Sequence, residues 1–463
     1  MHAIKVLREK KELGLDNVVF QIDESHVGNS ETRCYFENST AVLNEQVIDS
    51  SKEHATWNNS VEFLMSCIAV SVGFGNIWRF PFTAYENGGG AFLIPYVVLL
   101  FLVGKPFYFL EMIIGQFSGS SSVKVWNMSP SFVGVGWAQF CSTVALATYY
   151  SSLMALTLYY LIASFSAELP WATCLKEWGD ACVDSSTKRN HNANNATEGN
   201  IDILNNFLNG SNKFQSSAEL YFSMTAIRRA FFFMMFVLGV GSAVGMTTGI
   251  ITVINEQFPN LKTWQIVVPT CLLGFSIGTV YVTPGGQFIL TLVDYYGTSF
   301  VVFILASFEM TGVIWFYGLE NFLEDLEFML DRKPSVYWRI CWFIVTPFIL
   351  ITIFIYTIAT LTPLTYGGTL LPGYAHAIGW TIFGIGIVQI PLWMLIAMLK
   401  NRKLPFIQML KRAFAPVNEW GPREVQQRKD WRIFKEERAR DREKRIQPIW
   451  KQILYVLLNM KPI

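Results

Sequence analysis

Long apolar runs separated by polar segments fill the sequence from residue 61 to residue 399. A helix needs about 20 mainly apolar residues to cross the hydrocarbon core of a bilayer. Eight runs reach that length, at residues 61–84, 91–117, 134–165, 230–254, 263–283, 289–318, 337–361 and 378–399. The pattern therefore predicts an all-α polytopic membrane protein with about eight transmembrane helices. The polar segments between the runs are expected to be loops.

The runs also divide the chain into five parts. Two of these parts carry the spans, and the others are an N-terminal tail, a long polar loop and a C-terminal tail. In chain order the parts are the tail 1–57, the first three spans in 58–165, the loop 166–229, the last five spans in 230–399, and the tail 400–463.

Composition agrees with a membrane protein. Hydrophobic residues make up 52% of the chain and charged residues only 15%, against about 25% in soluble domains. The net charge of +1 gives no reason to expect a nucleic-acid partner. No nucleophile–base set, phosphate-binding loop or metal-ligand spacing stands out, so the sequence does not predict an enzyme.

The basic residues indicate which way the spans run. Lysines and arginines are dense from Lys400 to Lys451, directly after the last run, which places this tail in the cytoplasm. An even number of spans then places the N-terminus on the same side. Arg228 and Arg229 break the rule, because they begin a run from the outside. They are either exposed at the interface or the mark of an unusual junction. Residues 430–445 alternate in charge and predict a solvated helix, with a basic face against anionic lipid as the alternative.

The long polar loop has the features of an extracellular segment. It contains two cysteines, Cys174 and Cys182, and two glycosylation sequons, at Asn195 and Asn209. Glycans and disulfides both form outside the cytoplasm. We therefore expect glycosylation at both asparagines and a disulfide between the two cysteines.

One stretch within the first run is unlike an ordinary span. Residues 71–90 read S-V-G-F-G-N-I-W-R-F-P-F-T-A-Y-E-N-G-G-G, with glycine breaks, an asparagine and an arginine. An unpaired backbone group in lipid costs several kcal/mol, so a broken helix persists only where it lines a cavity or is covered by protein. A charge within a span is by default a functional-site hypothesis. The alternative is a glycine-kinked packing helix whose Arg79 extends to the membrane interface.

This stretch closely resembles the first-span signature of the neurotransmitter:sodium symporters, solute carrier family 6, and among them the nutrient amino acid transporters. Further motifs resemble the same family along residues 54–400, including G-K-P-F-Y-F-L-E-M-I-I-G-Q, L-G-V-G-S and P-G-G-Q-F-I-L-T-L-V-D-Y-Y. The first three runs resemble family spans one to three, and the last five resemble spans eight to twelve. Nothing resembles spans four to seven. The resemblance thus implies an incomplete LeuT-type inverted-repeat fold, with the junction near residues 225–230.

The resemblance implies two sodium sites built from hard oxygens. Backbone carbonyls freed by the broken first span contribute to both. The implied sodium-binding residues are Ala69, Ser71, Val72, Asn76, Leu238, Gly241 and Ser242. Gly241 stands where many relatives have an Asp or a Thr, so one side-chain oxygen is missing there. Gly239 and Gly241 are alternatively close-packing glycines.

Substrate and gate residues follow from the same resemblance. Gly73 stands where monoamine carriers have an Asp, which indicates a substrate that brings its own carboxylate. The implied substrate-binding residues are Gly73, Gly75 and Tyr150. Arg79 and Asp294 match the extracellular gate pair. Trp57 and Glu256 match the cytoplasmic latch, with His54 where the family has an arginine. Phe117 replaces a tyrosine typical of chloride-dependent members, which argues against bound chloride.

The sequence leaves two functions open. The first is sodium-coupled symport of neutral amino acids across the plasma membrane, with Na⁺ and the amino acid as ligands and both termini in the cytoplasm. The second is a non-transporting truncated variant that associates with full-length transporters, or regulates them, as a homo- or hetero-oligomer. The missing block would hold half of the substrate pocket, and this favours the second.

Overall fold

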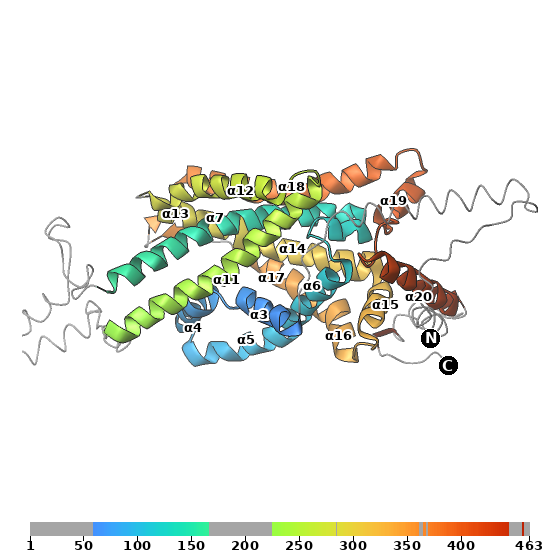
Figure 1. Cartoon of the computed structure of the whole chain (residues 1–463), viewed down its shortest axis with the longest axis horizontal. Coiled ribbons are helices and arrows are strands. Elements are labelled where there is room, and N and C mark those ends of the chain that lie inside the picture. Colours follow the sequence, from blue (N-terminus) through green and yellow to red (C-terminus); the bar gives the residue numbers. More distant parts are fainter. Residues whose placement is uncertain are drawn as a thin grey trace, which may run out of the picture. The chain divides into compact units, whose positions relative to one another are not determined.

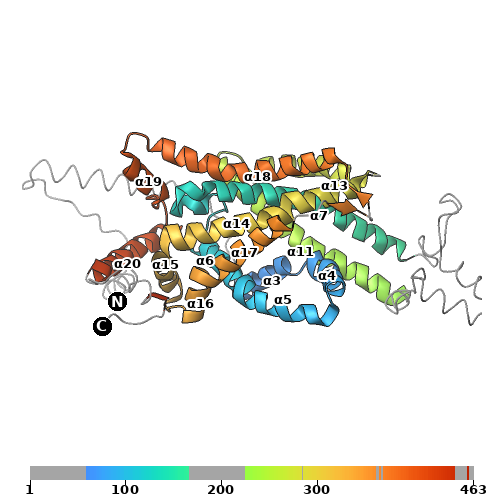
Figure 2. The same cartoon turned by 180° about the vertical axis from the view of Figure 1, so that it is seen from behind.

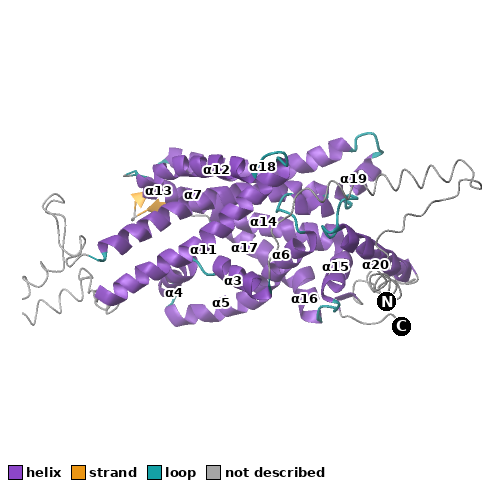
Figure 3. Ribbon diagram, in the orientation of Figure 1, coloured by secondary structure: helices purple, strands orange, loops and turns teal. Residues whose placement is uncertain are grey.

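The computed structural model describes residues 59–165, 225–283, 285–360, 364–366, 369–443 and 456–457. The chain divides into two units, residues 1–58 and 59–463, and all described residues lie in the second. Figure 3 shows that nearly all of these described residues are helical, apart from one short hairpin. The fold class predicted from the apolar runs is confirmed.

The described helices follow the predicted runs closely. In the first half of the chain they are α3 (Ser60–Ser71), α4 (Phe80–Glu86), α5 (Leu93–Leu99), α6 (Lys105–Ser118), α7 (Val133–Ala163), α11 (Thr225–Gln257) and α12 (Thr263–Gly278). In the second half they are α13 (Gly286–Leu292), α14 (Phe300–Met310), α15 (Leu319–Leu330), α16 (Val336–Ile340), α17 (Thr346–Ala359), α18 (Gly373–Lys400), α19 (Phe406–Phe414) and α20 (Val425–Glu443). The strands β1 (Thr365–Tyr366) and β2 (Thr369–Leu370) pair as an antiparallel hairpin.

Many spans consist of two α-helices joined by a short π-helical or 3₁₀ turn. Counted as continuous helices, seven are long and apolar enough to cross a membrane in the described part of the chain. A further pair of helices, Ser60–Ser71 and Gly75–Glu86, is bent by 48° at its break. If this pair is one span, the described residues contain eight candidate spans. These numbers agree with the eight predicted runs, and the bend falls where the glycine-rich stretch begins.

Helix α7 lies at the centre of the helical unit, packed along α11 on one side and α18 on the other (Figure 1, Figure 2). Two glycines let it approach its neighbours closely. A Cβ atom on Gly134 would lie 2.2 Å from the carbonyl oxygen of Gln389, and one on Gly136 would lie 2.2 Å from that of Ser122. Small residues at contacts between membrane helices have this effect. The glycines of this span are thus required for packing.

The predicted loop at residues 319–335 is wrong for most of its length. Residues 319–330 form the amphipathic helix α15, which follows a turn at Gly318 with φ of 102°. This left-handed conformation suits glycine, which lacks a Cβ. One face of α15 is apolar and buried, with Phe322 3% and Leu326 0% exposed. Two of the acidic residues, Glu324 and Asp325, are buried as well, at 6% and 2% exposed.

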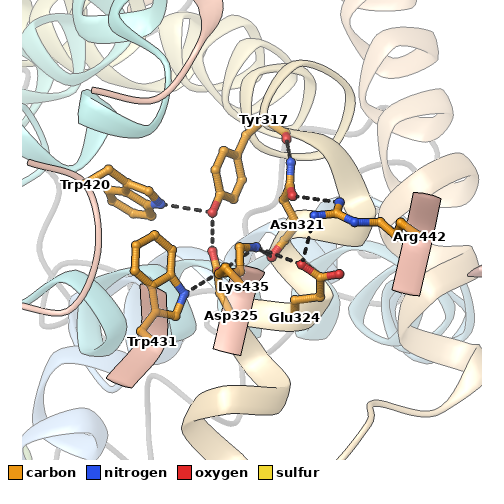
Figure 4. A network of polar contacts seen from close by, with 8 residues as sticks. All are labelled: Tyr317, Asn321, Glu324, Asp325, Trp420, Trp431, Lys435 and Arg442. Atoms are coloured by element: carbon orange, nitrogen blue, oxygen red, sulfur yellow. Dashed lines mark hydrogen bonds and ion pairs between the residues drawn. The ribbon is translucent and has the colours of Figure 1, made fainter. Parts of the chain in front are cut away.

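Those acidic residues bind the C-terminal helix α20, so the prediction of a solvated helix at residues 430–445 is wrong for one face of it. Asp325 accepts hydrogen bonds from Tyr317 Oη and from Trp431 Nε1, the latter at 3.0 Å, and pairs with Lys435 Nζ at 3.1 Å (Figure 4). Lys435 also pairs with Glu324 at 3.0 Å. The network joins α15 to α20 and continues through Arg442, which contacts Asn321 and Glu324.

Arg229, noted above as misplaced, has a defined role at the junction. Its Nε donates to the carbonyl oxygen of Ser164 at 3.1 Å, and its guanidinium lies 5.0 Å from the ring centroid of Phe165. These contacts are at the C-terminal end of α7, where carbonyls lack helical partners and a cation is favourable. The arginine therefore caps the preceding span.

Candidate functional site

The first span is broken between α3 and α4. Val72 adopts an extended conformation (φ −108°, ψ 107°), and a π-helical turn begins at Gly75. Asn76 spans the break: its Oδ1 accepts a hydrogen bond from Gly73 N at 3.0 Å, and its own N–H donates to Gly73 O at 3.2 Å. The asparagine thus satisfies backbone groups that the break would otherwise leave without a partner. Its Oδ1, predicted to bind sodium, has one lone pair left for that purpose.

Helix α11 faces the break and brings several predicted sodium residues together. Ser242 Oγ donates to the carbonyl oxygen of Ala69 at 3.4 Å. A Cβ atom on Gly241 would lie 3.2 Å from the same oxygen and 3.1 Å from Ala69 Cβ. Leu238 lies one helical turn before Ser242, on the same face of α11. The carbonyl of Ala69 is therefore held against the part of α11 where a cation would need further oxygen ligands.

The neighbouring glycines also serve the packing role that was left open. A Cβ on Gly239 would lie 2.7 Å from the ring of Phe74, and one on Gly245 would lie 2.7 Å from Val70.

The hydroxyl of Ser71 donates a hydrogen bond to the carbonyl oxygen of Cys67 at 2.7 Å and lies 3.3 Å from the hydroxyl of Tyr108. Tyr108 is thus a site residue that the sequence did not indicate.

Gly73 is enclosed by two hydroxyl groups. A Cβ atom there would lie 2.8 Å from Ser242 Oγ and 2.9 Å from Tyr150 Oη. Tyr150 also accepts a hydrogen bond from Phe74 N at 3.4 Å, and its ring packs on that of Phe74. The hydroxyl proton of Tyr150 has no acceptor among the described residues. A side chain at Gly73 would therefore require both hydroxyl groups to move, and Tyr150 directs a donor toward the break.

The predicted gate residues meet in an ion pair. Arg79 Nη2 lies 2.7 Å from Asp294 Oδ2, with 60% of the arginine side chain exposed but only 17% of the aspartate. Tyr149 donates to the other carboxylate oxygen, Oδ1, at 2.6 Å. The sequence shows the adjacent pair Tyr149–Tyr150, but it does not indicate this contact. The two tyrosines therefore serve different places, Tyr149 the gate and Tyr150 the break.

We expect Tyr149→Phe to lower the unfolding free energy by about 1.5–3 kcal/mol, because a hydrogen bond to a charged group is lost. Thermal unfolding of the purified chain in detergent measures this. The matched control is Tyr159→Phe, because Tyr159 lies on the same helix and is 60% exposed. Equal melting curves for the two variants would show that the Tyr149–Asp294 contact does not stabilise the fold.

Of the remaining predicted residues, Glu256 is within the described part of the chain and the others are outside it. Glu256 accepts hydrogen bonds from the backbone N–H of Ser121, at 3.1 Å, and from its hydroxyl. This fastens α11 to the turn after α6. The predicted latch partner Trp57 and the nearby His54 lie outside the described residues. So do four residues of the long polar loop, Cys174, Cys182, Asn195 and Asn209.

One side of the site faces away from α7 and α11. Ser71, Gly75 and Asn76 are exposed, and Tyr108 is 45% exposed. Large apolar side chains of the first span are exposed around them, including Trp78 (55%) and Phe82 (57%). Polar backbone at membrane depth is tolerated only when it is covered or lines a water-filled cavity. The described helices thus form one wall of a site, built from α3, α4, α7 and α11.

The oxygens gathered here are carbonyls, hydroxyls and one amide. In the described part of the chain no group of three or more His, Cys, Asp or Glu residues could hold a metal ion. Neutral hard oxygens are suited to an alkali or alkaline-earth cation, and they do not select a transition metal. The gate pair lies beyond the break, where Arg79 directly precedes the short helix α4.

Comparison with known proteins identifies the family. The model of the "Sodium:neurotransmitter symporter family" matches residues 54–227 and 214–401. The chain is 34% identical to "Sodium-dependent nutrient amino acid transporter 1" of Drosophila persimilis, over 84% of this chain and 88% of the relative. The proteins of the same name from Drosophila ananassae (33%; 88% and 94%) and Drosophila willistoni (34%; 89% and 95%) are similar as well.

These alignments are also longer than this chain. The one with the Drosophila persimilis protein runs over 576 positions, more than the 463 residues of this chain. The relative therefore has positions within the alignment that have no counterpart in this chain. The two segments matched by the family model meet at residues 214–227, beside the predicted junction. The chain belongs to the sodium:neurotransmitter symporter family.

Proposed function

We propose that the site around Gly73 is the substrate site of a sodium-coupled symporter for neutral amino acids. The observation that carries this proposal is the packing of Gly73, where a Cβ atom would lie 2.8 Å from Ser242 Oγ and 2.9 Å from Tyr150 Oη. A protein carboxylate at this position, as in monoamine carriers, would require both hydroxyl groups to move. The carboxylate beside the sodium ion must then come from the substrate, and Tyr150 supplies a hydroxyl donor for it.

The sodium ion is proposed to bind beside that carboxylate. Ala69, held against Ser242, supplies a carbonyl oxygen to one site. Val72, Leu238 and Gly241 are assigned to the same site, and Ser71 and Asn76 to the second. A half-helix that ends in an unwound segment directs free carbonyls at a cation and N–H groups at an anion. Both charges of the ion–substrate pair thus find partners at the break.

Uptake of labelled neutral amino acids into proteoliposomes that contain this chain tests the proposal. We expect an imposed sodium gradient to drive accumulation and a choline gradient to drive none. The control is the same preparation with Tyr150→Phe, which keeps the ring but removes the hydroxyl donor. Sodium-independent uptake, or equal uptake by the Tyr150→Phe protein, would contradict the proposed site.

The second candidate is a chain that does not transport but associates with complete relatives. The exposed side of the site and the predicted absence of family spans four to seven favour it. This candidate predicts that the chain alone takes up no amino acid. It also predicts that a complete relative takes up less amino acid when the two are co-expressed. An unchanged rate in the relative, with no co-purification, would rule out this candidate.

Several finer assignments belong with the proposal. We place the protein in the plasma membrane, with both termini in the cytoplasm and the loop 166–229 outside. In that loop we assign a disulfide between Cys174 and Cys182 and glycans at Asn195 and Asn209. Electrophoresis without reducing agent, with and without glycosidase, tests these two assignments. Chloride is not assigned, because Phe117 lacks the hydroxyl that would bind it.

A further inference from the structure

The basic residues of the short helix α19 are exposed and form no ion pair with any described residue. It follows the last span α18 after five residues, so it begins within about 20 Å of the end of that span. It lies at the same end of the helical unit as α15 and α20 (Figure 1, Figure 2). A helix in this place is at the depth of the membrane–water interface.

The C-terminal end of α19 is fixed to the protein. Ser131 Oγ donates to the carbonyl oxygen of Ala413 at 2.9 Å, and Ala413 is 1% exposed. The ring of Phe414 stacks on that of Phe316, with centroids 4.5 Å apart. These contacts hold the C-terminal end of the helix against the turn before α7 and the π-helical turn before α15. The orientation of α19 is therefore set by the fold.

The N-terminal half of α19 carries exposed apolar residues, on the same face of the helix as Ala413 and Phe414. Phe406 is 66% exposed and Ile407 68%, with Leu410 at 38% on the same face. On a helix, positions i, i+3 and i+4 lie on one face. In water this exposure would be unfavourable, but at a bilayer surface such side chains enter the boundary between headgroups and acyl chains. Leu404, 41% exposed in the preceding turn, extends the apolar face.

Basic residues accompany this apolar face and are available to an external anion. Five of them are exposed and form no ion pair with any described residue: Lys400, Arg402, Lys403, Lys411 and Arg412. Three cations of α20 differ, because Lys435, Arg438 and Arg442 pair with carboxylates of α15. Exposed cations beside an apolar face complement a negatively charged lipid surface.

We propose that α19 and the turn before it bind anionic phospholipid of the cytoplasmic leaflet. The phosphate and carboxylate of the headgroup pair with Lys403, Lys411 and Arg412, while Phe406 and Ile407 insert among the acyl chains. The leaflet follows from the orientation proposed above. The lipid binding itself is independent of transport and can be measured where uptake fails.

Native mass spectrometry of the full chain in detergent, titrated with phosphatidylserine or with phosphatidylcholine of identical acyl chains, tests this site. We expect tighter binding of phosphatidylserine. Lys411→Gln with Arg412→Gln should weaken it about fivefold for each cation removed and leave phosphatidylcholine unchanged. The matched control removes two exposed cations of α20, Lys429→Gln with Arg440→Gln, and should bind as the natural chain does.

Two further variants distinguish specific lipid binding at α19 from a folding defect and from general charge attraction. Lys411→Arg with Arg412→Lys keeps the charge and should keep the preference, which excludes a folding defect as the cause of the loss. Phe406→Ser with Ile407→Ser should weaken binding of both lipids. The soluble headgroup glycerophosphoserine should not compete at equal concentration. Equal binding of the two lipids by the natural chain, equal loss in the α19 and α20 charge variants, or full competition by the headgroup would overturn the proposal.

Discussion

Gly73→Ala is expected to lower the affinity of this chain for its amino acid by about 5-fold to 150-fold, because overpacking a close-packed position costs about 1–3 kcal/mol. The added Cβ would lie 2.8 Å from Ser242 Oγ and 2.9 Å from Tyr150 Oη, closer than carbon and oxygen normally approach. Both hydroxyls must move, and with them the oxygen beside Ala69 and the donor for the substrate carboxylate. Equilibrium binding of labelled amino acid to purified chain, in sodium and in choline, measures the effect.

The matched control is Gly249→Ala on α11, where an added Cβ meets nothing within 4 Å. Alanine is the better helix former, so this variant should bind as the natural chain does and unfold at an equal or higher temperature. If the Gly73→Ala protein also bound the amino acid normally, the close approach of the Ser242 and Tyr150 hydroxyls to Gly73 would have no part in recognition. If both variants lost binding together, the loss would come from folding.

The spans were predictable because lipid leaves the backbone no alternative to a helix. The run predicted at 337–361 is observed as Val336–Ala359, and the run at 263–283 as Thr263–Val282. The broken first span was equally predictable, since glycines and an asparagine in an apolar run cannot all be buried in lipid as regular helix. Its position against α11 followed from family resemblance, and the Ala69–Ser242 contact agrees with it.

Contacts between distant charged segments were not predictable from the charge pattern of either segment alone. The charged segment 319–335 predicted a loop, and the alternating charges of 430–445 predicted a solvated helix. An amphipathic pattern does not say what covers its face. A signal was nevertheless present. Glu324 and Glu327 are three residues apart, and Lys435, Arg438 and Arg442 have helical spacing as well. Two complementary stripes of this kind can pair along two helices, as the ion pairs between α15 and α20 do here.

The separate contacts of Tyr149 and Tyr150 in α7 were also not predictable from the sequence. In the sequence they form one motif, and only the packing separates their roles. Tyr149 reaches Asp294, which is 145 positions away, while Tyr150 turns toward Gly73. Successive residues of a helix point about 100° apart, so two neighbours can serve two sites. Which site each one serves depends on the position of α7 between its neighbours.

Asp325→Ala is expected to detach α20 from α15, at a cost of about 3–5 kcal/mol, because it breaks a buried charge pair and leaves its partners unsatisfied. The side chain of Asp325 is 3% exposed, and Tyr317, Trp431 and Lys435 all donate to it (Figure 4). Trypsin cleavage within α20 measures the detachment directly. A loss of about 3 kcal/mol would raise the open fraction, and thus the cleavage rate, by about a hundredfold.

Glu437→Ala is the control, because it removes an exposed carboxylate from α20 without touching the network. It should leave cleavage unchanged. Lys435→Met removes the cation instead, and it should accelerate cleavage less than Asp325→Ala if the indole and phenol donors matter as well as the charge. Equal cleavage of the Asp325→Ala and natural chains would mean that the apolar contacts of Trp420 and Trp431 hold α20 without the carboxylate. In that case the buried aspartate would be a cost that the fold tolerates, since a buried pair is not by itself evidence of net stabilisation.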